Sequence, residues 1–319
     1  MHAQRSSRFT GLTASVFLGA IASIALGFST LALAGEALDL SPQQPGRIRV
    51  DKDPAAIKAI SPNFHFVKEG TLTVAIHPTI PPISTYATDA KTIVGYDADL
   101  AQVVADSLGR KLELVPVSWA DWPLALESGK VDAVLSNVTV TEARKQKFDF
   151  SSYRQDKVGF YVKSDSKITS LKEPKDVAGL RIITDSGTNQ EKILLAWDKE
   201  NVAHGLKPVE VQYYDEVAVK NLALQAGRAD AIFSVNATQA YQAALQGKTR
   251  LAGTVSGGWP RTAELAIATR KGSGLADSFT TSLNDLIASG VYTRVLDRWN
   301  LGSEAITKSA TNPPGLPNL

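Results

Sequence analysis

The sequence predicts an α/β fold built as two lobes of similar plan. Residues 124–136 (LALESGKVDAVLS) and 222–234 (LALQAGRADAIFS) match at an offset of 98 residues. Each copy ends a helix at a glycine and continues into a short strand, and a further strand precedes each helix. Two strands joined by a helix pair in parallel. Because the offset is too long for a stacked repeat, it predicts two separate lobes.

The remaining elements follow from apolar spacing. In the first half we expect a strand at 72–76, a helix at 95–109 and strands at 111–117 and 132–136. The second half predicts a strand at 181–185, a helix at 188–201, a strand at 209–214 and helices at 215–227 and 236–247. A strand at 263–271 and helices at 273–290 and 291–302 complete the series. We expect residues 35–69 to form an extended surface leader and residues 304–319 a frayed tail.

The N-terminus has the pattern of an export signal. Arg5 and Arg8 precede an uncharged stretch from Phe9 to Gly35, which contains Ala32-Leu33-Ala34, a typical cleavage site. The alternative is a membrane anchor, since the apolar run is nearly long enough to span a bilayer. The small residues favour a cleavable signal peptide at residues 1–34 and a periplasmic mature protein.

Composition excludes several classes of function. The chain has no cysteine, which rules out disulfides, thiolate metal sites and a lipidated N-terminal cysteine. Removing residues 1–34 leaves 32 basic and 32 acidic residues, without the basic excess of a nucleic-acid-binding protein. The remaining histidines lack metal-ligand spacing, and no nucleophile motif occurs. We therefore expect no cofactor and no metal.

The stretch SNVTVTEARKQKFDFS (136–151) suggests a binding site for a small anion. Hydroxyl and amide side chains are followed by Arg144, whose planar guanidinium matches a carboxylate with two parallel hydrogen bonds. The alternative is a strand that runs into a polar surface helix.

Three motifs together resemble a known family. They are GYDADLA (95–101), the segment from Thr139 to Ser151 and the turn GTNQE (187–191). With the C-terminal segment 271–299, they resemble the type II periplasmic solute-binding proteins of ABC importers, in the amino-acid-binding class known as bacterial extracellular solute-binding protein family 3. The resemblance covers residues 70–303.

The resemblance implies two Rossmann-like lobes joined by hinge strands near 158–162 and 259–265. Lobe 1 would comprise 70–157 and 262–303, and lobe 2 would comprise 163–256. A ligand would bind between the lobes, and contacts to both would drive closure. The implied partners are a small carboxylate-bearing solute and an ABC permease in the inner membrane. We expect a monomer that is not an enzyme.

The resemblance also assigns roles to individual residues. Arg144 corresponds to the arginine that binds the α-carboxylate, and Thr139 would bond the same group. Asn137 would accept from an amine through its carbonyl, and Trp119 would form an aromatic wall. Amides of Gly187, Thr188 and Asn189, at a helix N-terminus, would bind the carboxylate from the other lobe.

Two positions depart from the family pattern. Val235 and His77 stand where amino-acid binders usually carry acids for the α-ammonium group. Asn236 can accept one bond without charge, and Glu264 is a candidate compensating acid. We therefore predict a carboxylate-bearing small solute rather than a standard α-amino acid, and a solute with a neutral, substituted or missing amine is an open alternative. The alternative is a periplasmic enzyme on the same scaffold, similar to cyclohexadienyl or arogenate dehydratases, with His77 or Glu264 as acid or base.

Overall fold

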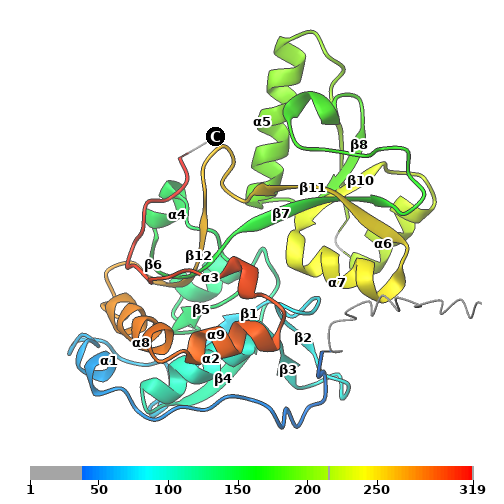
Figure 1. Cartoon of the computed structure of the whole chain (residues 1–319). Helices are drawn as coiled ribbons and strands as arrows, with labels where there is room; N and C mark the ends of the chain where they lie inside the picture. Colours follow the sequence, from blue (N-terminus) through cyan, green and yellow to red (C-terminus); the bar gives the residue numbers. More distant parts are fainter. Residues whose placement is uncertain (1–37, 215, 318–319) are drawn as a thin grey trace, which may run out of the picture. The chain divides into compact units, whose positions relative to one another are not determined.

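Two mixed β-sheets organise the protein, which is described by a computed structural model at residues 38–214 and 216–317 (Figure 1). The strand orders are β4-β1-β5-β12-β6 in the first sheet and β11-β7-β10-β8-β9 in the second. A small hairpin is formed by β2 (Thr85–Tyr86) and β3 (Ile93–Val94). The predicted two-lobe α/β fold is confirmed.

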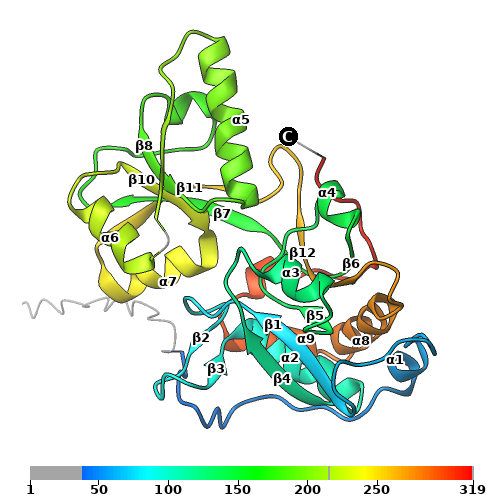
Figure 2. The same cartoon turned by 180° about the vertical axis from the view of Figure 1, so that it is seen from behind.

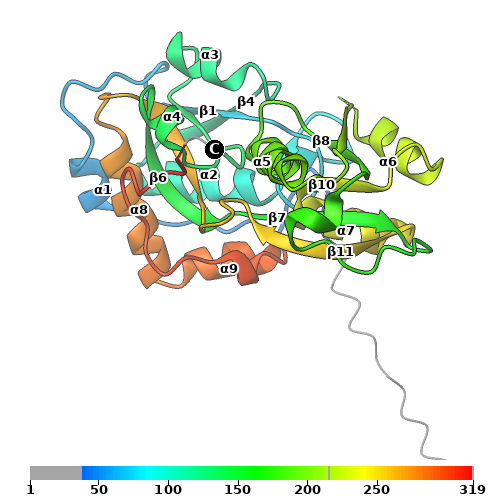
Figure 3. The same ribbon diagram turned by 90° about the horizontal axis from the view of Figure 1, so that it is seen from above.

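The first sheet has helices on both faces. Its strands are β1 (Thr71–Ile76), β4 (Lys111–Pro116), β5 (Ala133–Val134), β6 (Phe148–Gln155) and β12 (Glu264–Arg270). Leu72 and Val74 face one core while Ala75 faces another, because successive side chains of a strand point to opposite faces. Figure 3 shows α3 on one side of this sheet and α8 and α9 on the other. The helices of this lobe are α1 (Pro54–Lys58), α2 (Tyr96–Ser107), α3 (Trp122–Glu127), α4 (Glu142–Lys145), α8 (Ala276–Ala288) and α9 (Val291–Arg298).

Parallel pairing follows the strand–helix–strand plan in both lobes. In the first, β1 pairs in parallel with β4 and β5, and Figure 2 shows β1 and β4 side by side. In the second, β8 pairs in parallel with β9 and β10. Those strands are β8 (Arg181–Thr184), β9 (Glu210–Tyr213) and β10 (Ala231–Val235), and antiparallel β7 (Lys157–Lys163) and β11 (Thr249–Ser256) complete the sheet. The helices are α5 (Asn189–Ala203), α6 (Val217–Gln225) and α7 (Asn236–Gln246), with a short 3-10 turn at Pro174–Val177. A second 3-10 turn, at Gly302–Glu304, follows α9 in the first lobe.

The chain passes twice between the sheets. The first crossing is Asp156, between β6 and β7, and the second is the segment 257–263, between β11 and β12. Residues 158–162, where we expected a hinge strand, lie inside β7. The crossings are hydrogen-bonded to each other: Asp156 N donates to Ala263 O at 2.9 Å, and Gly257 N donates to Asp156 O at 3.0 Å. Any hinge rotation must therefore bend both crossings together.

The C-terminal segment corrects the expectation of a frayed tail. Residues 310–316 pair with the first lobe: Asn312 N donates to Phe150 O at 2.8 Å and Leu316 N donates to Val140 O at 3.0 Å. Leu316 is buried. Prolines and small polar residues prevent regular structure locally, but backbone groups that find partners elsewhere in the protein still hold the segment in place.

The N-terminal part of the chain before β1 is not uniformly extended. It includes the short helix α1, whose Ala56 is fully buried, and Leu40 and Ile48 pack on the first core. The predicted signal peptide, residues 1–34, lies outside the described residues. Across residues 38–214 and 216–317, no helix combines the length and apolar character needed to cross a membrane.

Candidate functional site

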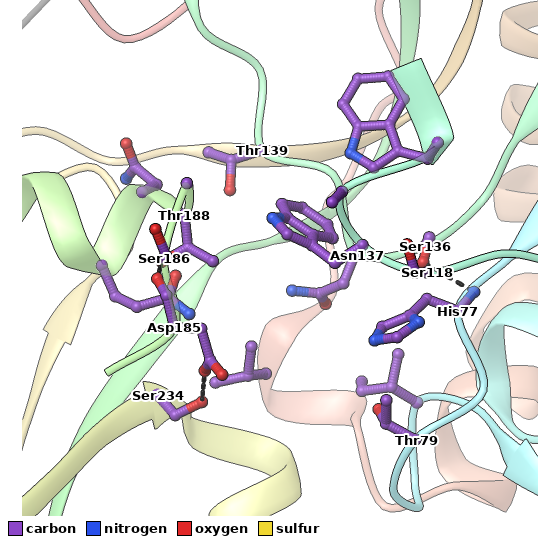
Figure 4. A pocket seen from close by; sticks show the side chains of 18 of the residues that line it. His77, Thr79, Ser118, Ser136, Asn137, Thr139, Asp185, Ser186, Thr188 and Ser234 are labelled. Carbon is purple, nitrogen blue, oxygen red and sulfur yellow. Dashed lines mark hydrogen bonds between the residues drawn. The ribbon is translucent and has the colours of Figure 1, made fainter. Parts of the chain in front are cut away.

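A cavity of about 1000 Å³ is lined by residues of both lobes. Figure 4 shows Asp185, Ser186 and Thr188 on one side, His77, Ser118 and Ser136 on the other, and Asn137 and Thr139 between them. Almost all of these residues follow the carboxyl ends of parallel strands: β1, β4 and β5 in the first lobe, and β8 in the second. This is where open α/β sheets bind ligands. The sheets thus bring polar loops from both halves of the chain to one cavity.

Arg144 lines this cavity from α4. Its Nη1 donates to Thr139 O at 2.8 Å, and its Cζ lies 5.5 Å and 5.7 Å from the ring centroids of Trp119 and Trp122. Burial lowers the pKa of Arg144 to about 10, so the side chain remains protonated at neutral pH. It forms no ion pair with any acid in the described part of the chain. The cavity therefore contains a partly desolvated cation that no carboxylate of residues 38–214 or 216–317 pairs with directly.

Thr139 and Asn137 lie in the same loop after β5 and already hold protein partners. The Thr139 hydroxyl donates to Asp156 Oδ2 at 2.6 Å. The Asn137 side-chain oxygen accepts from Arg154, and Asn137 has a left-handed backbone with φ of 53°. Asparagine tolerates that conformation better than most residues. Thr139 can thus still accept from a ligand, and Asn137 has its amide nitrogen available as a donor.

The turn before α5 differs from our expectation at Gly187. Its N–H donates to Glu191 Oε2 at 2.6 Å, so this amide is already occupied. Thr188 caps the helix by accepting from Glu191 N at 3.3 Å. Asn189 is buried, and its side-chain Nδ2 has no hydrogen-bond partner among the described residues. The second lobe therefore offers the Asn189 amide rather than the Gly187 N–H.

Asp185 and Lys220 form an ion pair in the second-lobe wall, which the sequence analysis did not identify. Ser234 Oγ also donates to Asp185 Oδ2 at 3.0 Å (Figure 4). Because the two charges offset each other, this pair adds polarity to the wall without adding net charge.

His77 and the tryptophans complete the first-lobe wall. His77 Nδ1 lies 2.9 Å from the carbonyl oxygen of Val117, and a carbonyl only accepts, so Nδ1 carries the proton. Nε2 of the neutral ring is then an acceptor. Trp119 lies at the cavity as expected, and its centroid is 6.3 Å from that of buried Trp122. The two indoles form one apolar surface beside Arg144.

The structure corrects the prediction that Asn236 contacts the ligand, because Asn236 does not line the cavity. Its Oδ1 accepts from Tyr161 OH at 3.0 Å. Asn236 is the first residue of α7, and the helical period places Val235, Thr238 and Gln239 on the cavity side instead. The amide therefore has a structural partner in β7.

We expect Asn236→Ala to leave ligand affinity within about twofold of the parent, since the side chain is turned away from the cavity. Losing the Tyr161 hydrogen bond should lower the free energy of unfolding by about 1 kcal/mol. Isothermal titration calorimetry and urea unfolding measure the two quantities. A large loss of affinity with unchanged stability would show that Asn236 contacts the ligand after all.

Sequence reasoning missed several lining residues for different reasons. Trp122 begins α3 and has no motif that marks a binding site. Asp185 and Ser234 lie at the ends of strands, so their position at the carboxyl end of a strand was a usable signal for both side chains. Asp156, by contrast, lies at a sheet crossing and carries no local motif. Glu264, considered as a compensating acid, does not line the cavity, and its buried Oε2 has no hydrogen-bond partner within the described residues.

Comparison with known proteins places the chain in a family. Residues 72–302 match the family model of bacterial extracellular solute-binding proteins, family 3. The chain is 32% identical over 239 residues to the L-cystine-binding protein TcyJ of Escherichia coli (strain K12), covering 73% of this chain and 84% of that one. The protein belongs to the bacterial extracellular solute-binding proteins, family 3.

Solved structures agree with this assignment. An ancestral arginine-binding protein bound to arginine has a TM-score of 0.64 and 28% identity, over 72% of this chain and 98% of its own. The ancestral amino acid-binding protein AncCDT-1, a precursor of cyclohexadienyl dehydratase, has a TM-score of 0.62 and 26% identity, over 72% of this chain and 95% of its own. Both share the two-lobe fold.

Proposed function

We propose that the protein is a periplasmic receptor that captures a small carboxylate-bearing solute, an amino acid or amino-acid derivative, and delivers it to an ABC permease. The solute binds in the cavity between the lobes, and its carboxylate pairs with Arg144. Thr139, Asn137 and the Asn189 amide supply further polar contacts, and Trp119 packs against the apolar part of the solute. We further propose that the lobes, 70–157 with 262–303 and 163–256, close about the two crossings.

One observation carries this proposal: the unpaired guanidinium of Arg144 faces a cavity whose walls come from both lobes. A carboxylate that meets Arg144 and the second-lobe amides interacts more strongly with the closed form than with the open form. Closure can draw only on that difference in affinity. Family membership and the names of the relatives, which bind cystine and arginine, support an amino-acid ligand.

A thermal-shift screen followed by calorimetry tests the proposal. L-cystine, L-arginine, L-glutamine and a set of organic acids are added to the protein freed of co-purified ligand. A ligand at a hundredfold excess over Kd should stabilise the folded state by about 2.7 kcal/mol and raise Tm. A complete absence of binding by carboxylate-bearing solutes would overturn the proposal.

The alternative is an enzyme on the same scaffold, which the resemblance to a dehydratase precursor favours. His77 lines the cavity and has an acceptor nitrogen available, as a general base requires. Incubation with arogenate or prephenate and mass spectrometry of the products distinguishes the two functions. A receptor returns the ligand chemically unchanged, whereas a dehydratase releases its aromatic product.

A further inference from the structure

Asp156 is a buried carboxylate that lies at both the cavity and the first crossing. The residue is 5% exposed and lines the cavity. Thr139 donates to its Oδ2 at 2.6 Å, and a Cβ at Gly257 would lie 2.2 Å from the Asp156 carboxyl carbon. Glycine at 257 therefore allows the second crossing to cover the carboxylate on one side. Its remaining open side is the cavity.

The other charged groups of the cavity wall are paired or exposed. Lys220 pairs with Asp185, and Lys147 pairs with Glu127 at 3.1 Å. Glu216 is exposed at the start of α6. After these are set aside, the wall formed by the described residues has one unpaired cation, Arg144, and one buried unpaired anion, Asp156.

Asp156 has no directly paired cation among the residues that the structure describes, although two arginines act on it. Arg154 and Arg144 both favour its ionised form through space, but neither forms an ion pair with it within the described ranges. Arg154 is already engaged by Glu304 and by the Asn137 amide. A buried carboxylate without a counter-ion is costly, so a cationic ligand group would stabilise it.

Thr139 connects the two unpaired charges. Its carbonyl accepts from Arg144 at 2.8 Å and its hydroxyl donates to Asp156 at 2.6 Å. The positive charge of Arg144 and the negative charge of Asp156 thus both line the cavity, and each is hydrogen-bonded to Thr139. An α-amino acid has the complementary arrangement, with carboxylate and ammonium attached to one carbon atom.

We propose that Asp156 binds the ammonium group of the ligand, so that the cavity takes a zwitterionic α-amino acid with a free amine. This deepens the proposed function and rests on it. Asp156 would replace the acids that are absent at Val235 and His77. The ligand ammonium would then bind at the crossing between the lobes, where closure can bury it.

Matched ligand pairs test this assignment. L-cystine is compared with 3,3′-dithiodipropionic acid, L-glutamine with glutaramic acid, and L-arginine with 5-guanidinopentanoic acid; each second compound lacks only the α-amine groups. Calorimetry measures each pair on the parent protein, Asp156→Asn and Asp132→Asn. Asp132 is a fully buried acid of the first lobe outside the cavity and controls for the loss of a buried carboxylate.

The parent should prefer the amino acid over its desamino partner, and Asp156→Asn should reduce that preference by about ten- to a hundredfold. Asp132→Asn should retain the preference, whatever its effect on Tm. If Asp156 only positioned Thr139, both members of a pair would weaken equally and the preference would remain, which would overturn the inference. Equal or tighter binding of the desamino acids by the parent would do so too, while leaving the proposed function intact. Binding of neither compound in any pair, together with no binding by any carboxylate-bearing solute of the thermal-shift screen, would overturn both.

The pH dependence provides a second readout. Burial raises the pKa of Asp156 to about 6, against the opposing effects of the Thr139 hydrogen bond, Arg154 and Arg144, while Glu304 adds to the rise. The carboxyl is therefore ionised at pH 7.5 and increasingly protonated below pH 6. Affinity for the amino acid should fall by up to about tenfold per pH unit below 6, and Asp156→Asn should lose this dependence. The same fall in both proteins would contradict the assignment.

Discussion

Arg144→Ala is expected to abolish detectable binding of the carboxylate-bearing ligand while leaving the protein folded. A charged hydrogen bond contributes about 1.5–3 kcal/mol, and a bidentate pair forms two of them. The loss of both corresponds to at least a hundredfold rise in Kd. Calorimetry with the tightest ligand of the screen measures the effect, and circular dichroism checks the fold.

Arg144→Lys is the matched variant because it keeps the positive charge and loses the planar guanidinium. We expect intermediate affinity, since an ammonium cannot form two parallel hydrogen bonds with a carboxylate and lacks the planar group that contacts the indoles of Trp119 and Trp122. The pKa of Arg144 is about 10, so this contact should add no pH dependence between pH 6 and 8. Unchanged affinity in Arg144→Ala would refute the site.

Deletion of residues 308–319 is expected to lower both stability and affinity. The segment supplies hydrogen bonds to Phe150 and Ser152 in β6, to Val140, and to Glu142, the first residue of the helix α4 that carries Arg144. At about 0.5–1 kcal/mol for each of these seven bonds, the free energy of unfolding should fall by about 4–7 kcal/mol. Because the family match ends at residue 302, this stabilising segment lies outside the shared family region.

A shorter deletion of residues 316–319 separates the two effects. It removes Leu316, whose backbone pairs with Val140 O at 3.0 Å and Glu142 N at 2.8 Å, but leaves the bonds to β6. Leu316 also lies against Gly258 in the second crossing, where a Cβ would come within 2.7 Å of its Cδ2. We expect a smaller loss of stability and an affinity about tenfold weaker, because the helix α4, which carries Arg144, loses its contact with Leu316.

Ser278→Ala controls for destabilisation alone. Ser278 is buried in α8 and donates to Ala56 O at 2.7 Å, outside the cavity lining. This variant should lose stability and keep its affinity. If the deletion of 316–319 leaves affinity at the parent value, the segment stabilises the first lobe without positioning Arg144.

The sequence alone was sufficient for the fold and for selecting Arg144, the residue on which the proposed function rests. The two segments that match at an offset of 98 residues predicted the two-lobe plan, because the spacing of apolar residues reflects the periods of strands and helices. Apolar spacing predicted β1, β4, β8, β9 and their helices to within a few residues. Arg144 followed from its motif, and in the structure it lies at the cavity without an acidic partner in the described chain.

Only the tertiary structure decided which polar groups are free. The Gly187 amide is occupied by Glu191, and Asn236 is held by Tyr161, although both sequence positions suggested a ligand contact. Asp156 has no motif, and it became a candidate because the sheets place it beside Thr139. The polar C-terminal tail likewise found partners in β6. Local sequence determines backbone conformation, whereas the availability of a donor, acceptor or charge depends on neighbours that are distant in the chain and adjacent only after folding.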